Sequence, residues 1–255
     1  IEYVVTCVII SIGIPLTLVA IYSLYFQVQN NNVAPIYIIN LLISDIIQFC
    51  YMIVEVAEPD WKIYVIFLYI YDFGLMASVG FMVCIALERY LVIAWPLWYR
   101  FRRTVKISLV VCVVVWTLPL VFVLLSFFWF ESSFIIRGVV FLVPFPLLIF
   151  FLGGTLKSLS AAISVSSDEK QRIVGILVLV LLIYTLLFLP TIIIYLVEKT
   201  RDNQIFSYLT VIFLQLSPLA DLILYVFMKK GVIDKLLASL CCCRMDSDDN
   251  SRSSA

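Results

Sequence analysis

Three aspartates and one Glu-Arg-Tyr triplet interrupt otherwise apolar stretches of this sequence: Asp45, Asp72, Asp221 and residues 88–90. A charge inside hydrocarbon is costly, so we expect each of these groups to have a partner or a functional role. A carboxylate accepts hydrogen bonds, and a guanidinium pairs with acids through exchangeable charge-assisted bonds. The chemistry predicted is therefore reversible ion pairing and cation binding.

Covalent catalysis finds little support in the same sequence. The chain has no histidine. It also has no serine in a nucleophile-elbow setting and no glycine-rich phosphate loop. We therefore predict that the protein is not an enzyme and requires no cofactor. The stretch 206–228 has no lysine for a retinal Schiff base. A net charge of zero gives no electrostatic case for binding nucleic acid.

Composition predicts which elements position the charged groups. The chain is 64% hydrophobic and 13% charged, with a mean hydropathy of +1.13. A soluble domain is nearer half apolar and a quarter charged, so an integral membrane protein is expected. The apolar stretches are long and do not alternate, which favours membrane-spanning helices over strands. There are seven of them: residues 3–26, 33–56, 63–94, 107–130, 134–156, 173–197 and 206–228. The predicted fold class is all-α, a seven-transmembrane helix bundle.

The basic residues predict the orientation of this bundle. Of the 17 lysines and arginines, only four fall on the side of the N-terminus: Lys62, Arg137, Lys199 and Arg201. The excess on the other side predicts an N-terminus outside the cell.

Three parts of the chain are expected. Residues 1–229 form the transmembrane domain, 230–243 an amphipathic eighth helix with a cysteine block, and 244–255 a disordered cytoplasmic tail. Cys241, Cys242 and Cys243 follow that helix closely, so we expect palmitoylation, with unmodified thiols as the alternative.

Helical spacing connects the two ends of the third stretch. At about 100° per residue, Tyr71, Ser78 and Arg89 fall on nearly one face, and Asp72 lies about 100° from it. A polar face of this length is expected to line the interior of the bundle, with Arg89 between an outer pocket and an inner partner surface.

The ordered motifs resemble those of the rhodopsin-like (class A) G-protein-coupled receptors. Glu88-Arg89-Tyr90 looks like the family's D/E-R-Y motif at the inner end of the third helix. The other matches follow in the family's order: Asn40 with Asp45, Trp116, Pro144 or Pro146, Phe188 with Pro190, and Asp221 with Tyr225. The resemblance covers nearly the whole chain.

The sequence also departs from the family pattern. Thr17 replaces the usual first-helix asparagine, Leu222 a seventh-helix proline and Phe188 a sixth-helix tryptophan. Tyr64 stands where the third helix usually has cysteine, so the family's loop-to-helix disulfide cannot form. This absence, together with residues 95–103, looks most like the Mas-related receptors.

The resemblance implies three groups of site residues. An outer ligand site would include Asp72, Tyr71, Glu55, Tyr184, Phe188 and Gln215. Coupling to a heterotrimeric G protein would use Glu88, Arg89, Tyr90 and Tyr225. A mid-membrane sodium ion would lie among Asp45, Ser78, Ser217 and Asp221; the alternative is that one of the two aspartates is protonated.

The function predicted is that of a plasma-membrane, multi-pass receptor in the lipid bilayer. Because the outer side is acidic, the extracellular ligand is expected to be a cationic amine or a basic peptide. Its binding would move the sixth helix and release Arg89 from Glu169 or Asp168. The alternatives are a receptor for a lipid or nucleotide ligand and, third, a transporter or channel.

Overall fold

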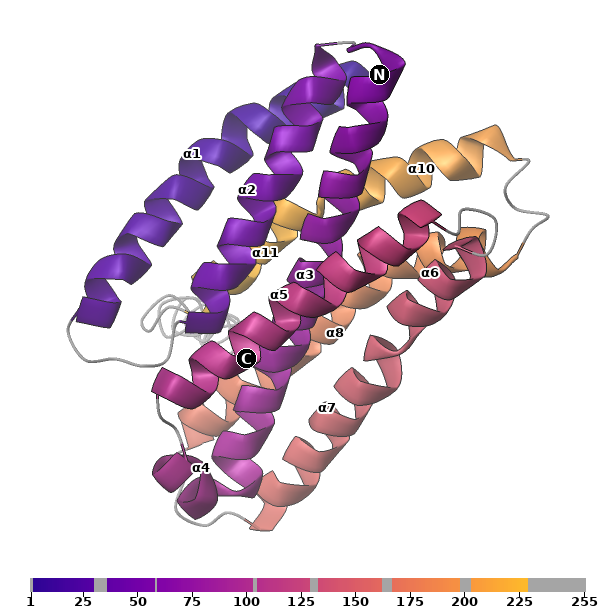
Figure 1. The fold of residues 1–255 in the computed structure, drawn as a ribbon. Coiled ribbons are helices and arrows are strands. Elements are labelled where there is room, and N and C mark those ends of the chain that lie inside the picture. The colour runs from indigo at the N-terminus through magenta and orange to yellow at the C-terminus, as the bar shows by residue number, and fades with distance from the viewer. Residues whose placement is uncertain are drawn as a thin grey trace, which may run out of the picture.

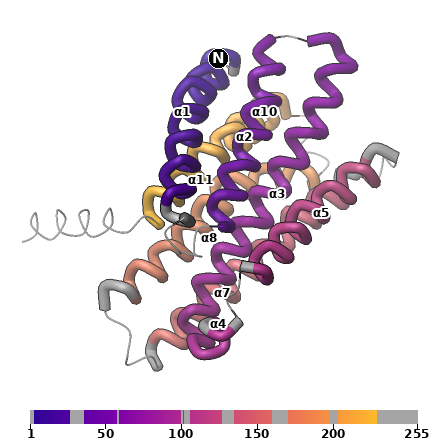
Figure 2. Tube along the Cα trace, turned by 60° about the vertical axis from the view of Figure 1, so that its left-hand side comes forward, coloured from indigo at the N-terminus to yellow at the C-terminus, as the bar shows by residue number. Residues whose placement is uncertain are grey.

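The computed structural model describes residues 2–29, 36–57, 59–102, 105–128, 133–161, 167–197 and 203–228. Figure 1 shows their path, and Figure 2 shows the same trace from another side. Ten helices are present in the described part of the chain: α1 (Glu2–Gln29), α2 (Ile36–Val56), α3 (Trp61–Ala94), α4 (Pro96–Arg102), α5 (Val105–Phe128), α6 (Ser133–Leu142), α7 (Pro144–Ala161), α8 (Ser167–Leu196), α10 (Gln204–Gln215) and α11 (Ser217–Met228).

These helices make seven spans that are long and apolar enough to cross a membrane. α6 and α7 together form the fifth span, and α10 and α11 form the seventh. The predicted seven-helix bundle is confirmed. The end of the bundle at which α3 begins is called the outer end below, and the end at which it finishes the inner end. The predicted eighth helix, the cysteine block and the tail lie outside the described residues, and the orientation stays a prediction.

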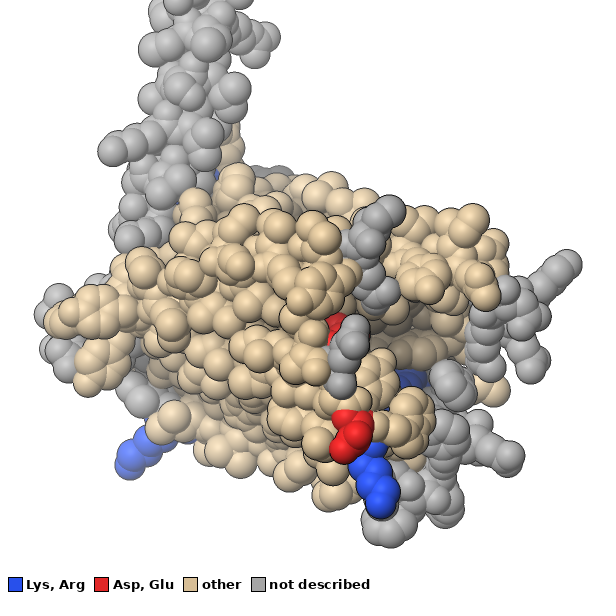
Figure 3. Space-filling model, turned by 90° about the horizontal axis from the view of Figure 1, so that it is seen from above, with Lys and Arg blue, Asp and Glu red and all other residues tan. Residues whose placement is uncertain are grey.

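The surface of the bundle is apolar, and polar groups lie inside it. Val19 is 66% exposed and Leu118 is 65% exposed, whereas Asp45, Ser78 and Asp221 are fully buried. Figure 3, a view from above, shows mostly uncharged residues and a few acidic and basic ones on that face of the described chain. Lipid tails can solvate exposed apolar side chains but not polar ones, so this inversion is what a bilayer selects.

α3 is the central element of the bundle. It packs against α2, α4, α5, α7 and α8, as the views in Figures 1 and 2 agree. Tyr71 and Ser78 are buried along its length, as their shared face predicted. The third span therefore touches both ends of the bundle and most of its other helices.

Two spans are broken where the sequence predicted one continuous helix. The fifth span breaks at Val143, just before Pro144. Pro144 and Pro146 have no backbone N–H, so the helix cannot continue its hydrogen bonds through them. The seventh span breaks at Leu216, ahead of Pro218.

Two neighbouring glycines in α7 differ in how closely the rest of the inner end packs against them. A Cβ on Gly154 would lie 2.6 Å from Cε2 of Tyr90, whereas a Cβ on Gly153 would meet nothing within 4 Å. Tyr90 is held there by Phe151, with ring centroids 5.7 Å apart.

Gly154→Ala is expected to lower the free energy of unfolding by about 1–3 kcal/mol, the usual cost of overpacking. Gly153→Ala is the matched control and is expected to gain up to about 1 kcal/mol from helix propensity. Denaturant unfolding in detergent micelles measures both. Equal stability of the two variants would show that the Tyr90 ring has room to move.

Candidate functional site

An ion pair lies at the outer end of the bundle. Arg137 on α6 places Nη1 2.8 Å from Oδ2 of Asp72 on α3, and their side chains are 14% and 11% exposed. Tyr195 of α8 hydrogen-bonds the same guanidinium. Asp72, predicted to contact a ligand, thus already has a partner, and one charged cluster joins three spans.

A second polar network crosses the outer end beside this pair. Gln215 of α10 donates from Nε2 to Oε2 of Glu55 on α2 over 2.9 Å. Its own Oε1 accepts from Thr6 of α1 at 3.0 Å. The Tyr51 hydroxyl donates to Oε1 of Glu55 over 2.8 Å. Glu55 and Gln215, which the sequence placed in one site, do lie together.

Tyr71 connects the two outer clusters. Its ring packs against Tyr51, with centroids 4.8 Å apart. Its buried hydroxyl has no hydrogen-bond partner among the described residues. A buried hydroxyl without a partner is costly, so this atom is suited to a polar group of a bound molecule.

The two predicted aromatic contacts are buried in a stack of rings. Tyr184 and Phe188 on α8 are fully buried and stacked, with centroids 4.8 Å apart. Phe141 stacks on Phe188 at 5.6 Å, and its carbonyl accepts from the Tyr184 hydroxyl. These residues link α8 to the break between α6 and α7, beneath the charged cluster of the outer end.

The predicted mid-membrane cluster is assembled in the structure. Ser78 of α3 donates to Oδ2 of Asp221 on α11 over 2.9 Å. The carboxyl groups of Asp221 and Asp45 lie next to each other. All three residues are fully buried, as is Ser217. Two adjacent carboxylates in a dry interior repel, so the pair needs a proton or a cation.

Buried carboxylate and hydroxyl oxygens are the polar atoms available as ligands in this part of the bundle. The Asp45 and Asp221 carboxyl groups have each other as neighbours, and the buried hydroxyls of Ser217 and Thr17 have no hydrogen-bond partner in the described ranges. Gln48, one turn from Asp45, approaches Oδ1 of that residue at 3.4 Å. Carboxylate and hydroxyl oxygens are the ligands that hard cations take, and the donor set fits one.

Asn40 and Trp116, matched in the sequence as separate motif positions, meet between α2 and α5. Trp116 donates from Nε1 to Oδ1 of Asn40 over 2.9 Å. Asn40 donates in turn to the carbonyl of Ile36 over 2.8 Å. This bond connects α5, the least buried of the seven described spans, to the inner half of α2.

The Glu-Arg-Tyr triplet stands at the inner end of α3. Glu88 is buried and accepts a hydrogen bond from Tyr99 of α4, 2.6 Å from its Oε1. Arg89 is half-buried, Tyr90 packs on Phe151, and Tyr225 of α11 packs partly buried against the core. The side chains of Asp168 and Glu169, the predicted partners of Arg89, lie outside the described residues.

Comparison with known proteins adds to this geometry. Residues 16–135, from α1 to the beginning of α6, match the protein family described as 7 transmembrane receptor (rhodopsin family). This part of the chain is similar to that family. The seven spans, the central third helix and the Glu-Arg-Tyr triplet agree with that similarity.

Individual relatives of the rhodopsin family match part of the chain. The type-1 angiotensin II receptor of Oryctolagus cuniculus is 29% identical over 125 residues, which are 44% of this chain and 33% of that receptor. The Mas-related G-protein coupled receptor member X1 of Homo sapiens is 29% identical over 139 residues, 53% of this chain and 42% of that receptor. The matches thus span about a third to two fifths of the length of these relatives.

Sequence reasoning missed three side chains of the sites described above. Arg137 appeared only as an outer basic residue, although its position in an apolar stretch was a signal like that of Asp72. Tyr99 appeared only within residues 95–103, without a role of its own, and Gln48 was not singled out. Each acquires its role from a neighbouring helix, which local spacing does not reveal.

Proposed function

We propose that this chain is a G-protein-coupled receptor that binds an extracellular ligand at the outer end and activates a heterotrimeric G protein at the inner end. The single observation that carries the proposal is that α3 makes polar contacts with other helices at three separate levels. Asp72 pairs with α6, Ser78 bonds α11, and Glu88 bonds α4. A ligand that repacks the outer pair can thereby bias contacts at both other levels.

Nucleotide exchange tests the proposal directly. The full chain in lipid nanodiscs is expected to accelerate exchange on a purified heterotrimeric G protein, and Arg89→Ala is expected to remove that acceleration. Empty nanodiscs provide the baseline. Ion or solute flux through proteoliposomes with no exchange on any G protein tried would favour a transporter or channel instead.

The proposed mechanism requires the inner end of α8, the sixth span, to move. Arg172 of α8 donates from Nη2 to the carbonyl of Met228 at the end of α11, 2.9 Å away. Lys170 points at the carbonyl of Leu159 on α7 from 3.4 Å. Outward movement of α8 would break both contacts. The two contacts therefore restrain α8, together with any acidic partner of Arg89.

Arg172→Ala is expected to raise ligand-free nucleotide exchange by about tenfold, because a hydrogen bond to a charged group contributes roughly 1.5–3 kcal/mol. The control is Gln171→Ala, whose side chain is exposed one position away. Exchange is measured with both variants at equal receptor concentration. A ligand-free rate equal to that of the control would remove Arg172 from the restraint.

The proposed ligand is a cationic amine or basic peptide that competes with Arg137 for Asp72. The proposed ligand would also contact the Tyr71 hydroxyl, which has no hydrogen-bond partner among the described residues, and the Glu55–Gln215 network. The rings of Tyr184 and Phe188 would lie below it. Asp72→Asn is expected to abolish responses to cationic agonists found by library screening. Undiminished responses would exclude this ligand class.

Arg137 favours a second candidate, a lipid or nucleotide ligand that carries an anionic group. A guanidinium binds phosphate or carboxylate through paired hydrogen bonds. Arg137→Gln would then remove the response while Asp72→Asn would keep it, the reverse of the pattern for a cationic ligand. The two variants together distinguish the two chemistries.

A sodium ion is the proposed occupant of the mid-membrane cluster. Asp45, Ser78, Ser217 and Asp221 would hold it, and its charge would offset the repulsion between the two carboxylates. A proton on one aspartate is the alternative. Palmitate on Cys241, Cys242 and Cys243 and residence in the plasma membrane complete the proposal; those cysteines lie outside the described residues.

A further inference from the structure

A cavity of about 320 Å³ lies at the inner end of the bundle, among α2, α3, α4 and α5. Its lining includes Glu88, Tyr99, Ser108 and Val111, and none of its lining residues comes from α7, α8 or α11. It is therefore separate from the side on which α8 moves in the proposed mechanism. Its volume is within the range of small-molecule sites, near the lower limit.

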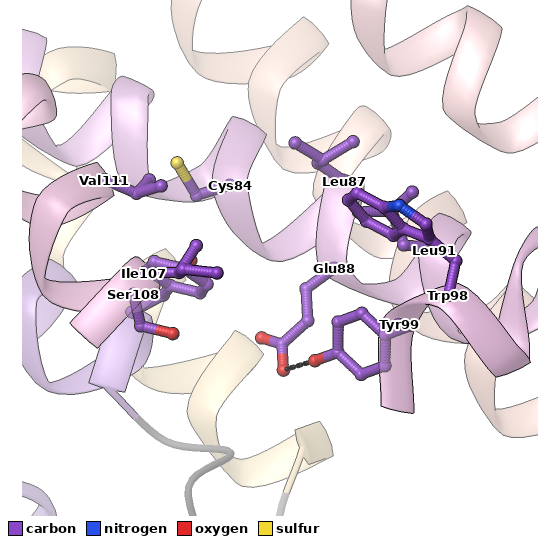
Figure 4. A pocket seen from close by; sticks show the side chains of 10 residues that line it. Cys84, Leu87, Glu88, Leu91, Trp98, Tyr99, Ile107, Ser108 and Val111 are labelled. Carbon is purple, nitrogen blue, oxygen red and sulfur yellow. Dashed lines mark hydrogen bonds between the residues drawn. The ribbon is translucent and has the colours of Figure 1, made fainter. Parts of the chain in front are cut away.

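The wall of the cavity is mostly apolar, and its polar side chains on α3, α4 and α5 are gathered toward the inner end. Cys84 and Val111 line its deeper part, one turn or so further into α3 and α5 than the polar groups. Toward the inner end stand the carboxylate of Glu88 and the hydroxyls of Tyr99 and Ser108. Figure 4 shows the carboxylate between Ser108 on one side and Tyr99 on the other. An amphiphile in the bilayer has the same order, apolar chain inside and polar head at the interface.

The mouth of the cavity is on the outside of the bundle. Ile107 is 44% exposed and Trp98 is 52% exposed, and both line it. Trp98 and Tyr99 belong to α4, which lies at the inner end (Figure 1). Tryptophan and tyrosine are enriched at the membrane interface. A molecule dissolved in the inner leaflet can thus enter without passing through the bundle.

The polar groups select the charge of the head. Glu88 is 6% exposed and offers a carboxylate, which only accepts hydrogen bonds when it is ionised. The Ser108 hydroxyl is hydrogen-bonded to Tyr37, across the mouth from Tyr99. An anionic head would meet repulsion from Glu88. An ammonium head would gain a charge-assisted bond in surroundings of low dielectric constant.

We propose that this cavity binds a lipophilic amine, with the alkyl chain against Val111 and Cys84 and the ammonium group on Glu88. The bound ammonium competes with Tyr99 for the carboxylate and so changes how α4 is held to α3. The proposal concerns binding alone and holds whether or not the chain activates a G protein.

Saturation binding of tritiated decylamine to the full chain in phosphatidylcholine nanodiscs tests the site, with binding to empty nanodiscs subtracted. Saturable binding is expected. Decanol should compete about tenfold more weakly, because it lacks the charge-assisted bond, and decanoate should not compete. Non-saturable uptake, or equal competition by decanol, would overturn the proposal.

Two variants locate the bound amine. Glu88→Gln keeps an acceptor for Tyr99 and is expected to weaken decylamine binding about tenfold. The affinity of decanol, measured by its competition with the remaining decylamine binding, is expected to be unchanged. Val111→Phe fills the deeper part and is expected to abolish binding. Val114→Phe is the matched control, on the same helix but 50% exposed to the outside. Wild-type affinity in both Glu88→Gln and Val111→Phe would place the amine elsewhere.

A third variant covers a failure of Val111→Phe to fold, judged by its helix content. Ser108→Leu places an apolar side chain beside the carboxylate, where the ammonium head lies. It is expected to weaken decylamine binding more than that of decanol. An equal effect on both ligands would contradict the placement of the head.

Discussion

Asp72→Ala is expected to destabilise the protein by about 3–5 kcal/mol, the usual cost of removing one partner from a buried ion pair. The Arg137 guanidinium then remains at the outer end without its carboxylate partner, beside the neutral hydroxyl of Tyr195. Denaturant unfolding in detergent micelles, followed by tryptophan fluorescence, measures the loss.

The double variant Asp72→Leu with Arg137→Met is the control for this prediction. It removes both charges and keeps most of the volume, so its stability is expected to lie close to that of the wild type. A double-mutant cycle with the two single variants then gives the coupling energy. Additive losses would mean that the two side chains contribute independently and that the pair does not hold α3 to α6.

Asp221→Ala is expected to produce the second large loss. The substitution leaves the Ser78 hydroxyl without its acceptor and adds a cavity beside Asp45. Each polar group left unpaired is expected to lower the free energy of unfolding by about 1–3 kcal/mol. Asp221→Asn is the matched control, because its amide carbonyl can still accept from Ser78. It should retain most of the stability.

The same variants test the proposed cation. Sodium chloride is expected to raise the unfolding temperature of the wild type above its value in equal choline chloride, since a ligand that binds the folded state stabilises it. Asp221→Ala should show no such difference. A sodium effect of the same size in both proteins would place the ion outside the cluster.

The spans could be predicted from the sequence because bilayer thickness imposes a length and a polarity on each. The interior face of α3 was also predictable, since Tyr71 and Ser78 follow helical spacing. Even the mid-membrane cluster was anticipated, through Asp45 and Asp221. In these cases the determining physics is local to one helix or common to the family pattern.

Pairings between spans were harder to predict. Asp72 was expected to meet a ligand, and it meets Arg137, because nothing in the spacing of α3 tells which face of α6 lies opposite. Glu88 likewise meets Tyr99 of α4. The stack around Tyr184 and Phe188 depends on the break at Val143, which Pro144 and Pro146 could have indicated.

The outer end of α3 is held by groups that reductants do not attack. Tyr64, in the place of the family's cysteine, stacks on Trp61 with centroids 5.9 Å apart and lies 3.3 Å from the Tyr51 hydroxyl. Docking of this corner needs no oxidising compartment and no isomerase, only burial of the rings. This corner of the seven-span unit is therefore expected to keep its packing during cell-free synthesis in thiol-containing buffers.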